Sequence, residues 1–281
     1  MRKVFLPPDL KTFWSMKADY PQALVYAGGT DLLVRLRLRL SDSPVLICLE
    51  RIEELKGIED RGREVLIRAG TTHAAALAHP LIQRHFPVLS QALRVLGSPP
   101  IRHMGTLGGN LVTASPAGDT LPPLTVLEAE VEIQKSNARH RLAIKDFLLG
   151  PGLTSLKADE LVTGVWIKKQ PGTILQYFEK VGQRKSLAIA LVSMAAALKM
   201  EKGIVQSARL AWGSVGPTVI RCPEAEAILK GHPLTAALLE KAAASIRQSV
   251  TPITDLRAGA EYRRQVAGNL LFRLLDLVPK N

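Results

Sequence analysis

Apolar residues in the first seventy positions come in short runs that end on glycine or on an acidic residue. The run ALVYAGG at residues 23–29 indicates a buried strand that ends on two glycines. The runs PVLICLE at residues 44–50 and EVLIRAG at residues 64–70 predict two more strands. Between them, TDLLVRLRL predicts a helix that presents Leu32, Leu33, Leu36 and Leu40 on one face.

Two helices are predicted after the third strand. Thr71 and Thr72 can cap a short helix, HAAALAH, and Pro87 opens another that ends at Gly97. From residue 98 to residue 119 no amphipathic period fits, and the segment is rich in glycine and proline. We predict a long irregular loop there, and a loop of that length in a compact protein usually serves a function.

The remaining chain divides into a strand-rich part and a helix-rich part. A short helix near residues 122–127 precedes predicted strands at residues 128–134, 140–147 and 159–168. The sequence KKQPGT at residues 168–173 is the best candidate for a domain boundary. Beyond it we expect strands at 174–181, 187–200 and 207–216, then helices at 223–230, 235–250 and 261–278. Strands followed by helices predict a separate α+β domain.

Composition narrows the classes of function. The 281 residues carry a formal net charge of +12, but the basic residues are dispersed and only 5% of residues are aromatic, which disfavours nucleic-acid binding. Cys48 and Cys222 are the only cysteines, too few and too far apart for an iron–sulfur or zinc site. With no signal-peptide pattern at the N-terminus, we expect a cytoplasmic protein.

The first glycine cluster is a candidate anion site. In AGGTD at residues 27–31, two glycines separate the predicted strand from the predicted helix. Glycine lets backbone N–H groups approach a ligand closely, and a helix N-terminus adds partial positive charge, so a pyrophosphate would suit the junction. Asp31 would repel a phosphate and is expected to cap the helix instead. Taken alone, the motif favours a plain tight turn.

The second cluster, GTLGGN at residues 105–110, lies inside the irregular segment. Its glycines again permit close approach, while Thr106 and Asn110 supply a hydroxyl and an amide. Asp119 follows nine residues after Asn110, and a carboxylate of this kind can accept two hydrogen bonds from a ribose diol. The alternative is a β-turn with an Asx cap.

Together the two clusters resemble the diagnostic motifs of the FAD-binding subunits of molybdenum hydroxylases, the family of the carbon monoxide dehydrogenase medium subunit and the xanthine dehydrogenase flavin domain. AGGTDLL and GTLGGNLVTASPAGD stand in the family's order. The resemblance extends to DELVTGV, to YFEKVGQRKSLAIALVSMAAAL and to EYRRQVAGNLL, so it covers nearly the whole chain.

The resemblance implies a fold and a domain organisation. Residues 1–168 would form a two-lobed FAD-binding domain of the vanillyl-alcohol-oxidase/xanthine-dehydrogenase flavin type, with its lobes meeting near residues 58–62. Residues 173–281 would form a small C-terminal α+β domain with a three- or four-stranded sheet. The expected fold class is therefore α+β.

The resemblance also implies roles for individual residues. The FAD pyrophosphate would lie against Tyr26, Ala27, Gly28, Gly29, Thr30, Asp31, Leu32 and Leu33. Thr106, Gly109 and Asn110 would hold the phosphates and the ribityl chain, and Asp119 would bind the adenosine ribose. Leu161 and Lys180 would lie near the flavin ring, and Leu96 would pack on FAD by spacing alone.

The implied activity is electron transfer within a complex. Electrons would pass from molybdopterin and [2Fe–2S] centres on partner subunits to non-covalent FAD on this chain, and then to NAD or another acceptor. Two readings stay open, namely a flavin-free docking subunit and a self-sufficient flavin oxidase. One departure is that no acidic residue follows Lys180 in the stretch Arg184-Lys185-Ser186-Leu187, where relatives often carry one.

Other candidate residues favour ordinary roles. His73 and His79 are six residues apart, whereas metal ligands on a helix are spaced by three or four. His103 is expected on a surface or in a loop, and Trp166 and Trp212 are expected in the core. The arginines at positions 35, 37 and 39 are predicted to form a solvated helix face, which could dock an acidic partner together with Arg263, Arg264 and Arg273 near the C-terminus.

Overall fold

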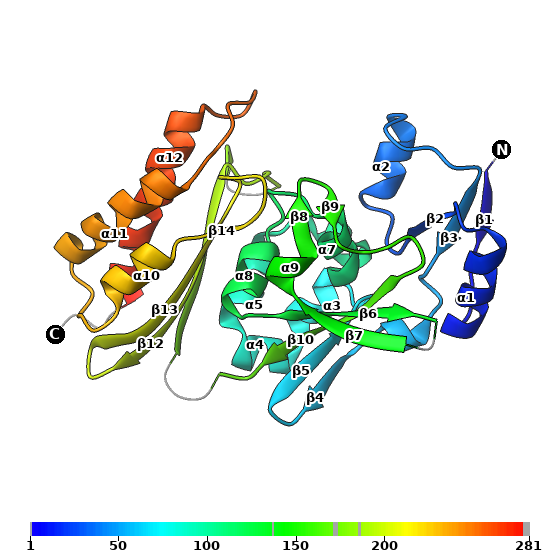
Figure 1. Ribbon diagram of the computed structural model, residues 1–281, viewed down its shortest axis with the longest axis horizontal. Helices are drawn as coiled ribbons and strands as arrows, with labels where there is room; N and C mark the ends of the chain where they lie inside the picture. The colour runs from blue at the N-terminus through cyan, green and yellow to red at the C-terminus, as the bar shows by residue number, and fades with distance from the viewer. Residues whose placement is uncertain (1, 137, 171–173, 185–186, 278–281) are drawn as a thin grey trace.

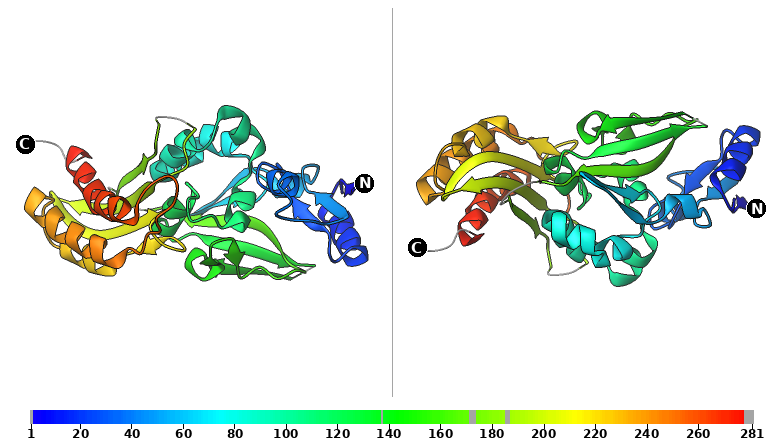
Figure 2. Two further views of the ribbon diagram at one scale, coloured as in Figure 1. Left: turned by 90° about the horizontal axis from the view of Figure 1, so that it is seen from above. Right: turned by 90° about the horizontal axis from the view of Figure 1, so that it is seen from below.

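A computed structural model describes residues 2–136, 138–170, 174–184 and 187–277. The chain runs along the long axis of the molecule, from a small N-terminal lobe at one end to three helices at the other (Figures 1 and 2). Its larger sheets are a three-stranded parallel sheet, a five-stranded antiparallel sheet and a four-stranded antiparallel sheet. This mixture of strands and helices confirms the predicted α+β class.

The N-terminal lobe is built on the parallel sheet, in the order β1-β3-β2. Its elements are β1 (Lys3–Phe5), α1 (Leu10–Asp19), β2 (Leu24–Tyr26), α2 (Leu32–Arg37), β3 (Val45–Cys48) and a 3₁₀ helix (Glu53–Leu55). Phe13, Ile47 and Ile52 fill a small core of its own. Cys48 is buried, as expected for an inert thiol in a strand.

The stripe of leucines predicted for α2 is wrong. The helix ends at Arg37, and Leu36 is buried while Leu33 and Leu40 are 48% and 67% exposed. The helix projects from the lobe instead of lying on its sheet (Figure 1). The leucine spacing therefore does not mark a buried helix face. Arg35, Arg37 and Arg39 are exposed, as predicted.

The second lobe contains the five-stranded sheet, in the order β4-β5-β10-β6-β7. Its strands are β4 (Ile58–Arg61), β5 (Glu64–Arg68), β6 (Glu130–Lys135), β7 (Ala138–Ala143) and β10 (Leu161–Lys168), with a two-stranded ribbon of β8 (Leu148–Gly150) and β9 (Leu153–Thr154). Its helices are α3 (His73–Ala78), α4 (Pro80–His85), α5 (Pro87–Val95), α6 (Pro99–Met104), α7 (Leu107–Thr113), α8 (Leu121–Val126) and α9 (Ile144–Phe147).

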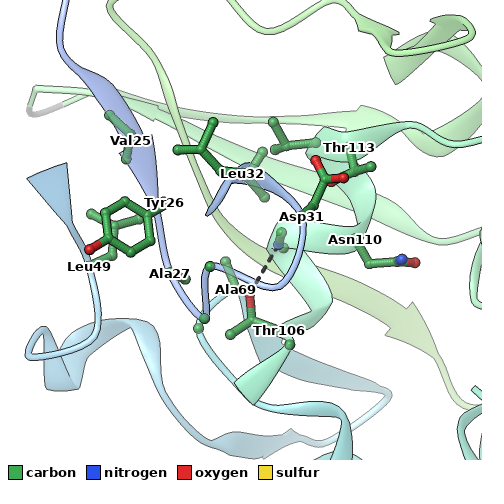
Figure 3. Close-up of a pocket in the computed structure, with 18 of the residues that line it drawn as sticks. Val25, Tyr26, Ala27, Asp31, Leu32, Leu49, Ala69, Thr106, Asn110 and Thr113 are labelled. Carbon is green, nitrogen blue, oxygen red and sulfur yellow. Dashed lines mark hydrogen bonds between the residues drawn. The ribbon is translucent and has the colours of Figure 1, made fainter. Parts of the chain in front are cut away.

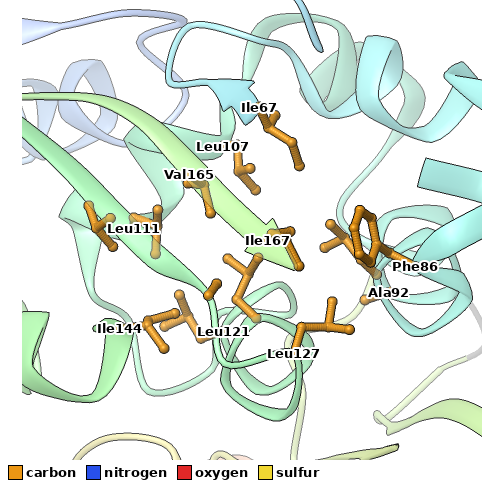
Figure 4. Packing of buried hydrophobic residues seen from close by; sticks show 14 of the residues in the cluster. Ile67, Phe86, Ala92, Leu107, Leu111, Leu121, Leu127, Ile144, Val165 and Ile167 are labelled. Atoms are coloured by element: carbon orange, nitrogen blue, oxygen red, sulfur yellow. The ribbon is translucent and has the colours of Figure 1, made fainter. Parts of the chain in front are cut away.

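Alternate residues of the central strands form the core of this lobe. Ile67, Val165 and Ile167 point to one face of the sheet, where they meet Leu107 and Leu111 of α7 (Figure 4). The glycine-rich helix is thus held by the sheet core. The predicted lobe boundary at residues 58–62 coincides with β4, so the chain changes sheets before it, between β3 and β4.

Two predictions of local structure are wrong in this lobe. The segment 98–119 holds α6 and α7, which escaped the periodicity test because each has only six or seven residues. The side-chain hydroxyls of Ser98 and Thr106 cap them. The strand expected at 140–147 ends at Ala143, and α9 follows.

The C-terminal part places one sheet between two layers of helices. Its strands are β11 (Ile174–Val181), β12 (Val192–Glu201), β13 (Ile204–Gly213) and β14 (Ile220–Arg221), and its helices are α10 (Pro223–Leu229), α11 (Ala236–Ser249) and α12 (Ala260–Asn269), followed by a 3₁₀ helix (Leu270–Leu277). The predicted helix over 261–278 therefore changes type after Asn269, and its end at residue 278 lies outside the described residues.

The position of β12 in the sheet explains the continuous apolar run in its sequence. Ala195 and Ala197 belong to the core of the second lobe, which includes α5 and α8, whereas Met194, Ala196 and Leu198 belong to the core shared with α10–α12. Both faces are covered, so the strand needs no polar face. Trp212 is fully buried on the helix side, as expected, while Trp166 is half-buried and donates its Nε1–H to Glu132. The division of the chain into domains at residues 168–173 stays a prediction.

None of the helices in the described part of the chain is long and apolar enough to cross a membrane. The predicted partner surface near the C-terminus changes, because Arg263 is only 3% exposed. Its guanidinium donates to the carbonyls of Leu191 and Ser214 and pairs with Asp255 at 2.8 Å. Arg263 therefore ties α12 to three loops and is not a surface cation.

We predict that Arg263→Ala lowers the free energy of unfolding by about 3 kcal/mol, because the carbonyls of Leu191 and Ser214 lose their buried donor and Asp255, which keeps Arg257, loses one of its two cationic partners. Arg264→Ala, on the exposed side of the same helix, should change it by no more than about 0.5 kcal/mol. Urea unfolding of both variants checks this. Equal stability of the two would show that the buried network contributes nothing.

Candidate functional site

The two glycine clusters meet at a cavity of about 420 Å³ between the N-terminal lobe and the second lobe. Its volume lies in the range of ordinary ligand sites. Predicted site residues line it, namely Tyr26, Ala27, Gly28, Gly29, Thr30, Asp31, Leu32, Thr106, Gly109, Asn110 and Leu161. Figure 3 shows the strand-to-loop segment from β2 crossing in front of α7. Val25, Leu49 and Val162 add an apolar wall.

Gly28 brings the two clusters into direct contact. A Cβ atom built on Gly28 would lie 1.6 Å from the carbonyl oxygen of Met104, so only glycine permits this approach. Gly105 continues the contact, since a Cβ there would lie 3.3 Å from Thr30 Oγ1. The backbone of His73 adds a hydrogen bond from its N–H to the Gly105 carbonyl at 2.9 Å. The floor of the cavity is therefore backbone packed on backbone.

The loop at residues 28–32 has a run of free donors. Within the part of the chain that the structure describes, none of the five backbone N–H groups from Gly28 to Leu32 has a hydrogen-bond partner. A run of unpaired N–H groups beside a cavity can bind an anion, because each amide carries partial positive charge. Gly29, with φ of +69°, supplies the left-handed turn that reverses the loop.

The second glycine cluster contributes in a different way. Leu107 and Gly108 donate their N–H groups to the carbonyls of Thr71 and Ala69 at 3.0 and 2.8 Å, and Gly109 donates to Thr106 Oγ1 at 3.1 Å (Figure 3). Its amides are therefore already satisfied. A Cβ built on Gly109 would lie 2.9 Å from Thr106 Oγ1 and would meet no other atom within 4 Å apart from the backbone of α7 itself, so Gly109 leaves space on the cavity side of the helix.

Asn110 and Asp31 supply the polar side chains at the mouth of the cavity. The Oδ1 atom of Asn110 accepts a hydrogen bond from Thr120 at 2.5 Å, so its NH₂ group is the end left for a ligand. The cap predicted for Asp31 is wrong, because its carboxylate makes no hydrogen bond to the start of α2 and instead accepts one from Thr113 at 3.4 Å (Figure 3). Asp31 thus turns away from the free N–H groups.

His73 lines the cavity, although the sequence argument considered it only as a metal ligand. It is 3% exposed, it lines the cavity, and its Nδ1 atom is buried without a partner. Burial, with a smaller contribution from Arg102, lowers the pKa of His73 to about 4. The ring is therefore neutral at pH 7. Spacing to His79 tested only metal binding and could not reveal that His73 faces a ligand cavity. His103, by contrast, is exposed, as expected.

Four predicted site residues lie outside the cavity wall. Leu33 is exposed on α2, whereas Leu96, Asp119 and Lys180 form a second group where α5 approaches β11. Lys180 Nζ pairs with Asp119 Oδ2 at 2.6 Å and donates to the carbonyl of Val95 at 3.3 Å. We refer to Leu96, Asp119 and Lys180 as the Asp119–Lys180 group.

Burial disfavours the charged form of Asp119 even though Lys180 is its partner. It is 7% exposed, and its Oδ1 atom is buried without a hydrogen bond. Burial raises the pKa of Asp119 to about 6, against the opposing effect of Lys180. The buried Oδ1 atom of Asp119 therefore remains a free acceptor beside the ammonium group of Lys180.

Metal chemistry has no support in the described residues, which contain no cluster of three or more His, Cys, Asp or Glu side chains suited to a metal ion. The segment 65–118, which supplies α3–α7, has no acidic residue, while it carries Arg68, Arg84, Arg94 and Arg102. None of these four arginines lines the cavity, whose charged lining residues are Asp31, Arg35 and Glu160, so recognition of an anion there would depend on the backbone N–H groups.

Comparison with known proteins gives the same picture along the whole chain. Residues 1–168 match the family model described as the FAD binding domain in molybdopterin dehydrogenase, and residues 177–278 match the CO dehydrogenase flavoprotein C-terminal domain. The nicotinate dehydrogenase FAD-subunit of Eubacterium barkeri is 32% identical, over 88% of this chain and 84% of its own length. The nicotine 6-hydroxylase medium subunit of Paenarthrobacter nicotinovorans is 32% identical, over 96% and 94%.

A solved structure agrees in three dimensions. A chain of carbon monoxide dehydrogenase from Hydrogenophaga pseudoflava superimposes with a TM-score of 0.93 and 28% identity, covering 98% of this chain and 96% of that one.

The raised pKa of Asp119 predicts a pH dependence of stability. Because the pKa of this group in the folded state, about 6, exceeds the model value of 3.8, its contribution is complete at low pH and is lost as pH rises through about 6. Wild type should therefore lose about 3 kcal/mol relative to Asp119→Asn between pH 3.5 and pH 7. Urea unfolding across this range measures the difference, and parallel curves would contradict the assignment.

Proposed function

The chain belongs to the family of FAD-binding subunits of molybdopterin dehydrogenases, and we propose that it binds FAD without a covalent bond, with the diphosphate on the free N–H groups of residues 28–32. The observation that carries this placement is the run of five unpaired N–H groups beside the cavity. A diphosphate offers enough oxygens to accept from all of them without any side-chain cation.

The residues that line the cavity suggest how the rest of the cofactor would be held. Tyr26, Ala27 and Leu32 would flank the diphosphate from the loop side, and Thr106, Gly109 and Asn110 would flank it from α7. Thr106 acts through the helix cap that shapes α7, because its Oγ1 is already used there. Leu161, at the start of β10, would add an apolar contact towards the flavin half. Leu33, exposed on α2, would support the loop only through its contact with Gly29.

The ion pair changes the role proposed for Asp119. The resemblance places Asp119 at the adenosine ribose and Lys180 near the flavin ring, which are opposite halves of FAD. A separation of 2.6 Å between their charged atoms means that one moiety must neighbour both side chains. We place the whole Asp119–Lys180 group at the flavin half, with Leu96 packing on it, because β11 and α5 lie beyond the α7 end of the cavity. The adenosine ribose then falls to the Asp31 and Thr113 side.

The proposed activity is electron transfer inside a hetero-oligomer. FAD supplies chemistry that accepts two electrons and returns them to a second acceptor. The chain's own residues bind and orient it, and the described residues offer no metal cluster that could donate electrons. We propose that iron–sulfur and molybdopterin centres on partner subunits supply the electrons, and that NAD or another acceptor removes them. The proposed docking surface is the exposed segment that runs from α2 into the following turn, with Arg35 and Arg37 on the helix and Leu38, Arg39 and Leu40 beyond its end.

The function is tested on the purified chain. We expect a yellow protein whose flavin is fully released by acid precipitation, and which transfers electrons to an artificial acceptor but does not hydroxylate an aldehyde or a purine alone. A chain that stays colourless after incubation with FAD would identify a flavin-free docking subunit. Substrate turnover by this chain alone would identify a self-sufficient oxidase.

Gly109 provides a test that separates binding from folding. Gly109→Val puts a side chain into the space left beside α7, so we expect at least a hundredfold loss of FAD affinity, about 2.7 kcal/mol. The circular dichroism spectrum and thermal midpoint should stay close to wild type. Gly28→Ala is the contrasting variant, because its Cβ would meet the Met104 carbonyl and must disturb the fold. Unchanged FAD affinity in Gly109→Val would show that FAD does not bind at this site.

A further inference from the structure

One polar group in the cavity wall has no role in the fold. His73 is 3% exposed, yet neither of its ring nitrogens makes a hydrogen bond with the described residues. Buried polar side chains in native proteins are nearly always paired, and an exception calls for an explanation such as a ligand. His79 shows the contrast, since it accepts a hydrogen bond from the Leu81 N–H and so caps α4.

The geometry shows which edge of the ring faces the loop at residues 28–32. A Cβ built on Gly105 would lie 3.1 Å from His73 Cδ2 and 3.3 Å from Thr30 Oγ1, in a tight position that only glycine leaves unfilled. The Cδ2–Nε2 edge of His73 therefore lies close to Thr30 of the loop, and His73 lines the cavity. Nδ1 lies on the other side, sealed from solvent.

The protonation state follows from the same contacts. With a pKa of about 4, set by burial and then by Arg102, the imidazole is neutral at pH 7 and carries one proton. A proton on Nδ1 would be buried without an acceptor, which is the costlier way to leave this atom unpaired. The proton therefore resides on Nε2, and His73 presents an N–H donor on the side of the cavity.

We propose that His73 is a diphosphate-binding residue of this cavity, which donates a hydrogen bond from Nε2 to a phosphate oxygen held by the N–H groups of residues 28–32. This inference rests on the proposed function, since it specifies how the same site recognises its ligand. The nucleoside diphosphate thus meets the loop amides on one side and a neutral imidazole on the other. A residue larger than glycine at position 105 would meet both His73 and Thr30.

The test compares ligands that differ in phosphate content on the apo form of the full chain. The variants are His73→Leu, which removes the donor, and His73→Gln and His73→Asn, whose amides reach the positions of Nε2 and Nδ1. His103→Leu is the matched control, because His103 is exposed on α6 and does not line the cavity. The ligands are FAD, ADP and riboflavin, with flavin fluorescence and calorimetry as readouts.

We expect His73→Leu to lower the affinity for FAD and ADP by about tenfold to a hundredfold, which is the effect of losing one hydrogen bond to a charged group. The affinity for riboflavin should stay within about twofold of wild type. Gln should restore more affinity than Asn, and His103→Leu should match wild type. Unchanged FAD and ADP affinity in His73→Leu, or an equal loss for riboflavin, would overturn the inference while the proposed function stands. Failure of wild type to bind FAD would overturn both.

A second readout needs no variant, in case His73→Leu does not fold. In ¹⁵N-labelled wild type, ADP should shift the Nε2 resonance of His73, and adenosine should not. Equal shifts with both ligands, or no shift with either, would contradict a contact with the diphosphate.

Discussion

The close contact of Gly28 with the backbone at Met104 is the constraint on which the binding site depends. It brings the segment after β2, in the N-terminal lobe, against the segment before α7, in the second lobe, at a distance that excludes any Cβ atom. Nearby, the N–H of His73 donates to Gly105, and Thr72 pairs with Thr106, so three stretches of chain are fixed together. The cavity is the space that remains on the open side of this junction, which explains why its floor is backbone and its walls come from both lobes.

The site divides its tasks between two glycine clusters that look alike in sequence. Residues 28–32 keep their N–H groups free, whereas those of Leu107, Gly108 and Gly109 are used to anchor α7. The first cluster therefore supplies charge recognition, and the second supplies space and a rigid wall. The Asp119–Lys180 group lies at a different place, where β11 of the C-terminal sheet meets α5, so the C-terminal part contributes the cation of this pair and the second lobe contributes its carboxylate.

The sequence predicted the elements whose pattern is local. Four features could be predicted because each depends on residues that are neighbours in the chain. They are the strand before Gly28, the cap at Thr72, the buried strand around Trp212 and the motifs of the FAD-binding family. Helices α6 and α7 were not predicted because they are too short to show a helical period of apolar residues. The leucines of α2 gave a wrong expectation because helical spacing alone does not determine which side chains are buried. The pairing of Asp119 with Lys180, and the exposure of His73 to the cavity, join residues from distant elements, so no local pattern encodes them.

The central claim is that the backbone of residues 28–32 recognises a diphosphate. Amide hydrogen exchange of the apo chain, followed residue by residue with and without ADP, tests it most directly, because these N–H groups have no partner among the described residues to slow their exchange. The account predicts that ADP slows exchange at residues 28–32 strongly, that the already bonded amides of Leu107 and Gly108 change little, and that adenosine has no comparable effect. Unchanged exchange at residues 28–32 under saturating ADP would contradict it.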